Sequence, residues 1–212
     1  MHVIALVSIA LCSLSAVAPT EHREPCRPPP LTHGTLHVTG TKGVSAASGE
    51  FSYDSHGRKL HFTDSHNKTD IMDVLILFDE NVFYEIDSQN QSCKKRHLRS
   101  HIHAMEIPHN ATHIDESYLG SEYIGDQGVR MRTWQKTMTE LKGILTVSTT
   151  SCGCMTLTAS VFFESGDVLL FSFMDVETEV KDPHVFEPPS FCEELQFEET
   201  DENHFFEIFD HH

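Results

Sequence analysis

Short apolar stretches separated by polar turns recur along most of the chain. Apolar and polar residues alternate over 49–53, which places Phe51 and Tyr53 on one face of a strand. A second alternating stretch follows at 59–62, and the turn between the two contains Gly57, a residue suited to a left-handed turn position. The pattern therefore predicts a β-hairpin.

A second hairpin is predicted by the mostly apolar stretches 72–78 and 82–86, which flank the turn 79–81. Residues 74–78 are apolar without a break, so we expect this strand to be covered on both faces. Further strands are predicted at 129–134, 143–148, 157–163 and 168–176. Because short strands are this frequent and no strong helical period follows residue 18 outside the C-terminal tail, we expect an all-β fold, an antiparallel sandwich or barrel.

The first 18 residues predict the compartment. They contain no Asp, Glu, Lys or Arg and end in the small-x-small triplet Ala16-Val17-Ala18, as a secretory signal peptide does. A membrane anchor is the alternative, but the stretch is short for a span and no stop-transfer pattern follows. We therefore expect a signal peptide over 1–18, a single domain over 19–212, and a secreted protein that is not an integral membrane protein.

The acidic balance of the chain restricts its partners. The sequence has 32 acidic against 15 basic side chains, a formal net charge of -17, which argues against nucleic-acid binding because that needs a basic face. The one basic cluster, 94–96 with Arg99, could meet an anionic glycan or a lipid head group, or could be a solvated patch. The acidic, Phe-containing tail 193–212 predicts either a helix docked through its phenylalanines or a disordered end.

Histidines gather in one region and suggest metal chemistry. Imidazoles are good ligands for zinc or copper, although histidines in exposed loops usually bind nothing. The cluster consists of His97, His101, His103, His109 and His113.

Three triplets match the acceptor pattern for N-linked glycans. They begin at Asn67, Asn90 and Asn110, none has Pro in the middle, and each lies in a polar, turn-like setting. In a secreted protein we expect glycosylation at these asparagines.

Five cysteines remain after the signal peptide, and an oxidising compartment favours disulfides among them. Cys152 and Cys154 could form the redox pair of a thiol oxidoreductase, but their surroundings are strand-like, whereas a catalytic pair usually opens a helix. The Gly-x-Ser-x-Gly, phosphate-loop and His-Glu-x-x-His motifs are missing from the sequence. A non-enzymatic protein is therefore expected, with a thiol oxidoreductase or an unrecognised hydrolase as the alternative.

Several long segments resemble the ependymin family of secreted brain glycoproteins of bony fishes. The resemblance covers essentially the whole chain and is carried by residues 48–55, 84–88, 92–95, 105–108, 148–154 and 176–180. It implies a glycoprotein of brain extracellular (cerebrospinal) fluid that binds calcium weakly through sialylated glycans. It also implies association with extracellular matrix such as collagen and a role in neural plasticity or regeneration.

The resemblance also implies a fold and a set of covalent links. Mammalian relatives have two stacked antiparallel sheets around a hydrophobic pocket, similar to bacterial lipoprotein carriers, and are linked to lysosomes and lipid binding. We therefore expect a pocket of roughly a few hundred cubic ångströms that takes up lipid. The implied disulfides are Cys26–Cys152 and Cys93–Cys192. Cys154 is left to link two subunits of a homodimer, or else lies buried and unpaired.

Overall fold

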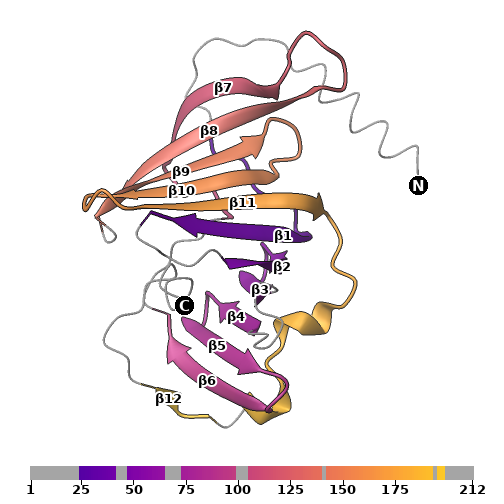
Figure 1. The fold of residues 1–212 in the computed structure, drawn as a ribbon, viewed down its shortest axis with the longest axis vertical. Coiled ribbons are helices and arrows are strands. Elements are labelled where there is room, and N and C mark those ends of the chain that lie inside the picture. The colour runs from indigo at the N-terminus through magenta and orange to yellow at the C-terminus, as the bar shows by residue number, and fades with distance from the viewer. Residues whose placement is uncertain are drawn as a thin grey trace.

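The fold is a single β-sheet that extends through nearly all of the described chain (Figure 1). A computed structural model describes residues 24–41, 47–64, 73–98, 105–139, 142–192 and 195–198. Within these ranges the sheet has 12 strands in the order β12-β6-β5-β4-β3-β2-β1-β11-β10-β9-β8-β7. Neighbouring strands are antiparallel except β12 and β6, which are parallel.

The strands follow one another as a meander with one long crossover. The first half comprises β1 (Leu31–Gly40), β2 (Ala47–Asp54), β3 (Lys59–Asp64), β4 (Asp73–Leu77), β5 (Val82–Asp87) and β6 (Ser92–His97). The second half comprises β7 (Thr112–Gly120), β8 (Gly128–Met138), β9 (Gly143–Thr150), β10 (Thr156–Phe163) and β11 (Val168–Glu177). The crossover from β6 to β7 lets β11 return to pair with β1. The 3-10 turns η1 (Pro183–Phe186) and η2 (Ser190–Cys192) and the two-residue β12 (Phe197–Glu198) complete the chain.

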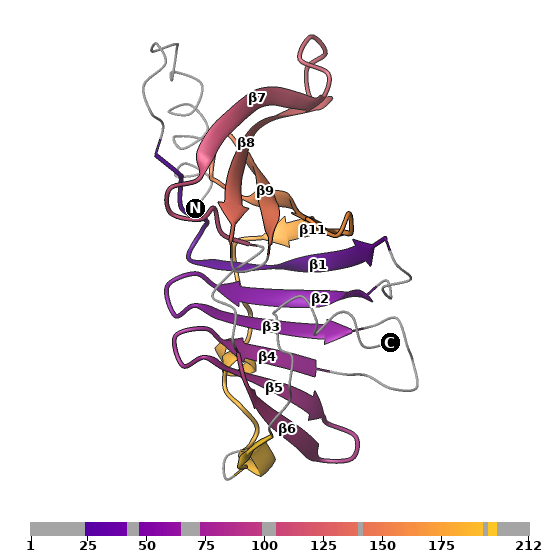
Figure 2. The ribbon, with the colours of Figure 1, turned by 90° about the vertical axis from the view of Figure 1, so that its left-hand side faces the viewer.

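The all-β class and both predicted hairpins are confirmed. The expected hairpins are β2–β3 and β4–β5, and the four later predicted strands are β8 to β11. Hydrogen bonds join what we expected as two sheets into one, and the strand direction turns strongly between β1–β6 and β7–β9 (Figure 2). This turn gives the sheet an inner face with one shared core, because one hydrophobic cluster contains Phe62 and Ile76 as well as Trp134 and Leu145.

The turn between β2 and β3 contains Gly57, which we expected at a left-handed backbone position, but the structure shows a different role for it. The residue with a left-handed backbone is Arg58, at φ 49°, rather than Gly57. The Asp54 carboxylate accepts hydrogen bonds from the backbone N–H groups of His56 and Gly57, at 2.9 and 2.8 Å. A Cβ on Gly57 would lie 2.5 Å from the Asp54 Oδ2 atom, so the glycine provides space for this carboxylate.

Strand β4 is buried on both faces, as its unbroken apolar sequence predicts. Val74 and Ile76 face the inner core, whereas Leu75 and Leu77 face a second cluster on the outer side of the sheet. That outer cluster is closed by Phe191, Cys192 and Leu195 from the segment after β11. The C-terminal segment therefore covers the outer face of β4–β6. Most of the predicted acidic tail, 193–194 and 199–212, lies outside the described residues.

The described part of the chain contains no helix long and apolar enough to span a membrane.

Truncating the outer cluster should destabilise the protein. We predict that Leu75→Ala lowers the free energy of unfolding by about 2–5 kcal/mol, since a fully buried leucine loses its contacts and leaves a cavity. The matched control is Leu119→Ala, whose side chain is 59% exposed and which should change stability by less than about 0.5 kcal/mol. Urea unfolding of both variants measures the difference, and equal effects would contradict the two-sided burial of β4.

Two histidines should give opposite pH dependences of stability. Burial lowers the pKa of His61 below its usual 6.5 although Asp73, 4.0 Å away, opposes this. The unfolded state then binds the proton more tightly, so stability falls as pH drops below about 6.5. The ring N–H of exposed His184 donates a hydrogen bond to the Glu187 carboxylate, which raises the pKa of His184. Its small contribution to stability is therefore present at acidic pH and lost as pH rises.

Unfolding measured at pH 7.5 and 5.5 tests both signs. Between pH 7.5 and 5.5, His61→Gln should lose less stability than the unmodified protein. His184→Gln should lose slightly more. A His61→Gln protein with an unaltered pH dependence would contradict the assignment of a buried, neutral imidazole.

Candidate functional site

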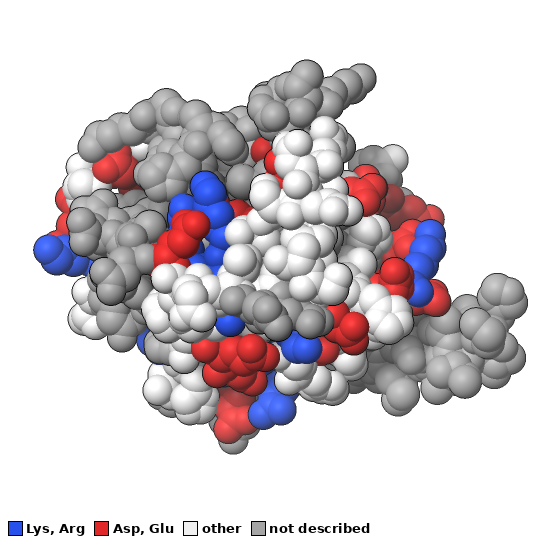
Figure 3. Space-filling view, turned by 90° about the horizontal axis from the view of Figure 1, so that it is seen from below, with Lys and Arg blue, Asp and Glu red and all other residues white. Residues whose placement is uncertain are grey.

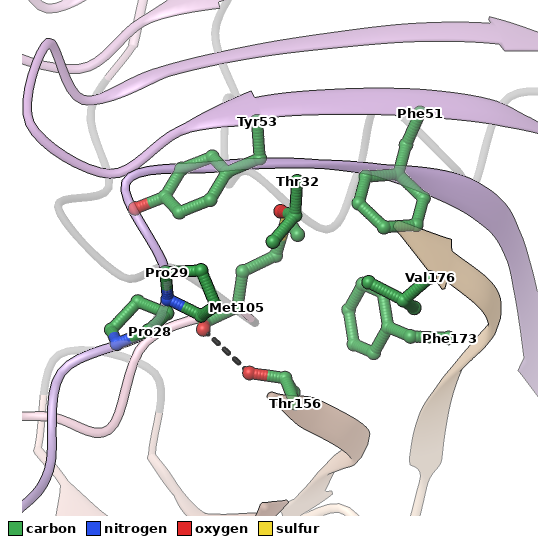
Figure 4. Close-up of a pocket in the computed structure, with 9 residues that line it drawn as sticks. All are labelled: Pro28, Pro29, Thr32, Phe51, Tyr53, Met105, Thr156, Phe173 and Val176. Atoms are coloured by element: carbon green, nitrogen blue, oxygen red, sulfur yellow. Dashed lines mark hydrogen bonds between the residues drawn. The ribbon is translucent and has the colours of Figure 1, made fainter. Parts of the chain in front are cut away.

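A small apolar cavity lies on the inner side of the sheet where β1, β2, β10 and β11 meet the N-terminal segment (Figure 4). Its volume is about 10 Å³, room for roughly one water molecule. It is therefore much smaller than the pocket that we expected for a lipid ligand. The cavity is lined by Pro28, Pro29, Thr32, Phe51, Tyr53, Met105, Thr156, Phe173 and Val176.

Strand alternation directs the lining side chains inward. Phe51 and Tyr53 lie two residues apart on β2, and Phe51 meets Phe173 of β11 edge to face with ring centroids 5.5 Å apart. Gly34 of β1 permits this contact, because a Cβ there would lie 2.7 Å from the Met174 carbonyl oxygen and 3.2 Å from the Phe51 ring. The aromatic wall of the cavity thus depends on three strands in fixed register.

Two hydroxyl groups hold the segment containing Met105 over the cavity. The Thr156 hydroxyl donates a hydrogen bond of 2.7 Å to the Met105 carbonyl oxygen (Figure 4), and the Tyr53 hydroxyl donates to the Glu106 carboxylate. Burial, together with the negative charge of Glu106, raises the pKa of Tyr53 far above its usual range. The phenol therefore stays protonated and acts as a fixed donor rather than as an acid or base.

A third hydroxyl in the cavity wall has no hydrogen-bond partner. Thr32 is 4% exposed, and its Oγ1 atom is buried without a partner in the structure. An unsatisfied buried hydroxyl costs free energy, so it is the one polar group of the cavity open to a bound molecule.

The Cys26–Cys154 disulfide corrects the pairing that we expected. Cys26 is bonded to Cys154, with Cα atoms 5.9 Å apart, and not to Cys152. Cys154 is buried with φ 54°, so it neither links two subunits here nor forms a redox pair with Cys152. Cys152 is itself disulfide-bonded. The bridge ties the Pro-rich N-terminal segment to the turn before β10, beside Thr156 in the cavity wall.

The second disulfide has the expected partners. Cys93 of β6 is bonded to Cys192 of η2, with Cα atoms 5.6 Å apart. It holds the C-terminal segment against the outer cluster of β4–β6, so its structural role is to fix the cover of that face.

Two of the three predicted glycan acceptors lie on exposed turns. Asn90 is in the turn between β5 and β6, where its side-chain amide donates to Asp87 at 2.6 Å. Asn110 is in the exposed turn before β7, with φ 69°. Both positions leave space for a glycan, whereas Asn67 lies outside the described residues.

The histidine cluster is not brought together in the described chain. His97 stacks on Phe197 at 3.7 Å, and His113 packs edge to face on Trp134 at 5.1 Å. His109 is exposed, and His101 and His103 lie outside the described residues. Among the residues that can be described, no group of three His, Cys, Asp or Glu side chains could hold a metal ion.

The predicted basic cluster is divided between the two faces of β6. Lys94 and Arg96 both pair with Glu85, at 3.6 and 2.6 Å, whereas Lys95 lies over the rings of Tyr84 and Phe197 on the other face. Arg99 lies outside the described residues. At this end of the molecule acidic and basic side chains are interspersed (Figure 3), so residues 94–96 do not form one patch for an anionic ligand.

Sequence reasoning missed the polar contacts of the cavity. The strand pattern placed Tyr53 beside Phe51, but no spacing rule connects Tyr53 with Glu106, 53 residues away. One signal could have been used: Leu36 and Val38 lie two residues apart, as on one face of a strand. Extending that alternation back along β1 puts Thr32 on the same, inward face.

A family model and named relatives place this chain in one family. The family model named Ependymin matches residues 66–192. A protein of Clupea harengus named ependymin is 56% identical over 209 residues, which cover 97% of this chain and 98% of that protein. A protein of the same name from Notemigonus crysoleucas is 49% identical over 99% of each chain. An uncharacterised conserved protein from Thermus thermophilus is a more distant structural neighbour, with a TM-score of 0.45 and 6% identity over 76% of this chain and 88% of its own.

Substitutions at two of the three cavity hydroxyls, those of Tyr53 and Thr32, should change stability in opposite directions. Tyr53→Phe removes the donor to Glu106 and should lower the free energy of unfolding by about 1–3 kcal/mol. Thr32→Val replaces an unpartnered hydroxyl by a methyl group of similar size and should raise it by about 1 kcal/mol. Thermal and urea unfolding measure both. A loss of stability in Thr32→Val would contradict the unsatisfied hydroxyl and indicate a water held in the cavity.

Proposed function

The chain belongs to the ependymin family, and from this membership and the structure we propose that it is a secreted, N-glycosylated, non-enzymatic binding protein of brain extracellular fluid. The observation that carries the proposal is the position of Asn90 and Asn110 on exposed turns of a strongly acidic, disulfide-bonded chain. Cerebrospinal fluid is the proposed location, with lysosomes as a further destination.

Disulfides support an extracellular location. Cys26–Cys154 and Cys93–Cys192 close segments of 128 and 99 residues, and such structural bridges persist in oxidising compartments. In the entropic model each constrains the unfolded chain by about 4–5 kcal/mol. The described cysteines include no free thiol, which supports a structural rather than a redox role for them.

Calcium and extracellular matrix are the proposed binding partners. Sialylated glycans on Asn90 and Asn110 would add negative charge to a polypeptide of formal charge -17, and hard cations prefer such oxygen ligands. Weak calcium binding by these glycans, with association to matrix such as collagen, is the proposed basis of a role in neural plasticity or regeneration.

The protein is also proposed to form a homodimer. Because Cys154 is bonded to Cys26 within one chain, Cys154 is not the link, and surface packing is the proposed source of the association.

Lipid binding is the second candidate function, favoured by the apolar lining of the cavity. Phe51, Phe173 and Val176 form its walls and Met105 lies over it. A bound acyl chain would have to displace the flexible Met105 side chain, since the cavity of about 10 Å³ is too small for it.

Removal of sialic acid tests the calcium proposal. Sialidase treatment of the secreted protein should remove most calcium binding measured by isothermal titration, with the circular dichroism spectrum unchanged. The triple variant Asn67→Gln, Asn90→Gln and Asn110→Gln, which removes all three predicted acceptors, should lose calcium binding similarly. Binding that survives sialidase but is lost on deletion of residues 199–212 would place the calcium on the acidic tail and contradict the proposal.

A fluorescent fatty-acid probe tests the lipid proposal. Binding should be saturable and displaced by unlabelled fatty acid, at ~0.8 kcal/mol per buried methylene. Val176→Phe narrows the cavity and should weaken binding by roughly 10-fold, whereas Val129→Phe, at an exposed position on β8, should not change it. Folded protein that gives neither binding nor displacement would contradict lipid binding.

A further inference from the structure

The outer face of the sheet is covered at one end and open at the other. Over β4–β6 the C-terminal segment covers it, with Phe191, Cys192 and Leu195 packed against the strands. Over β8–β11 and β1 large apolar side chains on the same face are exposed, including Phe162 and Met174 at 48% each and Leu170 at 39%. We name the central outward residues of these five strands the open face. The outward residues beyond it lie at its edge: Val129 at the start of β8, and the pair His33–Glu177 past the β-bulge, which includes one exposed carboxylate.

The strand register identifies the residues of the open face. Pairs facing each other across neighbouring strands, such as Thr146–Ser160 and Ser160–Leu170, point to the same side of the sheet. The face consists of Met131, Thr133, Gln135, Thr137, Ile144, Thr146, Ser148, Thr150, Thr158, Ser160, Phe162, Val168, Leu170, Ser172, Met174, Thr35, His37 and Thr39.

This set contains no Asp, Glu, Lys or Arg, although the chain as a whole is 22% charged. Solvated protein surfaces carry roughly 25–35% charged residues, so a surface of five strands with a single carboxylate, Glu177, at its edge is unlike a solvated one. The next strand, β2, has a charged outward residue, Glu50, which lies opposite Thr35. An uncharged region with apolar side chains among hydroxyls is typical of an interface between proteins.

Several hydroxyls of the open face are already satisfied within the chain. The Thr133 and Ser148 hydroxyls are 3.1 Å apart and hydrogen-bonded, and the Thr150 hydroxyl donates to the Cys152 carbonyl oxygen at 2.6 Å. Excluding water from such groups costs little, because each keeps its partner. The face can therefore be covered without the desolvation cost that buried charges would impose.

We propose that a second copy of this chain covers the open face, the two copies packing sheet against sheet. The proposal rests on the homodimer proposed above and assigns its surface. Two molecules that each carry a formal charge of -17 repel one another through most contacts, and an uncharged face is where they can approach without opposing carboxylates. A face of hydroxyls and aliphatic groups is also complementary to itself, as a two-fold dimer requires.

The size of the open face suits a stable dimer. Five strands spaced about 4.8 Å apart, with outward residues over about 25 Å of strand length, give a projected area on the order of 600 Å². The relief of the side chains makes the accessible area larger, so it approaches the ~800 Å² that each partner buries in a standard interface. Sheet-on-sheet packing at about 10 Å is an established way to bury such faces.

A charge placed at the centre of the open face tests the proposal. Ser160 lies on the middle strand, β10, between Thr146 and Leu170. In sedimentation velocity the unmodified protein should be a dimer, and Ser160→Glu should weaken association by at least ~100-fold, since it brings like charges together. The matched control Gln89→Glu adds the same charge on the exposed turn between β5 and β6 and should remain dimeric.

Hydroxyl-radical footprinting gives a second readout that does not depend on a variant folding well. In the unmodified dimer, oxidation of Phe162 and Met174 should be several-fold slower than at a dilution where the protein is monomeric. Tyr123, 92% exposed in the loop between β7 and β8, should be oxidised equally in both states.

The results separate the assigned face from the homodimer itself. A dimer that persists in Ser160→Glu with Phe162 and Met174 unprotected would overturn the open face and leave the homodimer intact. A monomeric unmodified protein would overturn both. If Ser160→Glu stays dimeric but loses retention on immobilised collagen, the occupant is a matrix protein and the proposal is wrong.

Discussion

The disulfides Cys26–Cys154 and Cys93–Cys192 each attach a non-strand segment to one side of the long sheet. Cys26–Cys154 holds the Pro-rich N-terminal segment on the inner side, next to Phe51 and Tyr53, and Cys93–Cys192 holds the C-terminal segment on the outer side of β4–β6. A single sheet has two faces, and its strands are stable only where apolar side chains on those faces are covered. The buried state of β4 and the shape of the cavity both depend on these attachments.

The same requirement explains the uneven surface of the molecule. The inner face is closed by the turn of the sheet and by Met105. Thr156 donates a hydrogen bond to the Met105 carbonyl oxygen, and Tyr53 donates one to the next residue, Glu106. In the described chain the outer face is closed over β4–β6, because the segment after η2 runs back along β6. Over β8–β11 and β1 the outer side remains exposed and has a single carboxylate, Glu177, at its edge, and a protein of high negative charge has a physical reason to reserve such a region for contact.

Family membership and structure contribute different parts of the functional picture. Membership is the basis on which a secreted glycoprotein is proposed, and Asn90 and Asn110 lie at exposed positions. The structure contributes a cavity that is narrow, almost wholly apolar and equipped with one unpartnered hydroxyl, that of Thr32. In this site the Tyr53 phenol is a fixed hydrogen-bond donor, and the other described side chains of the cavity wall are not ionisable.

Local pattern was sufficient for eight of the twelve described strands, β2 to β5 and β8 to β11. Alternation in β2 and the unbroken run of β4 were readable because side-chain direction in a strand has a period of two, whatever the partner strand. The choice of Cys154 over Cys152 as the partner of Cys26, the contact of Tyr53 with Glu106 and the cover over Leu75 were decided in the folded chain. These contacts join residues tens to more than a hundred positions apart. They depend on strand register and on the direction in which the sheet turns, and neither is recorded in the spacing of residues along the sequence.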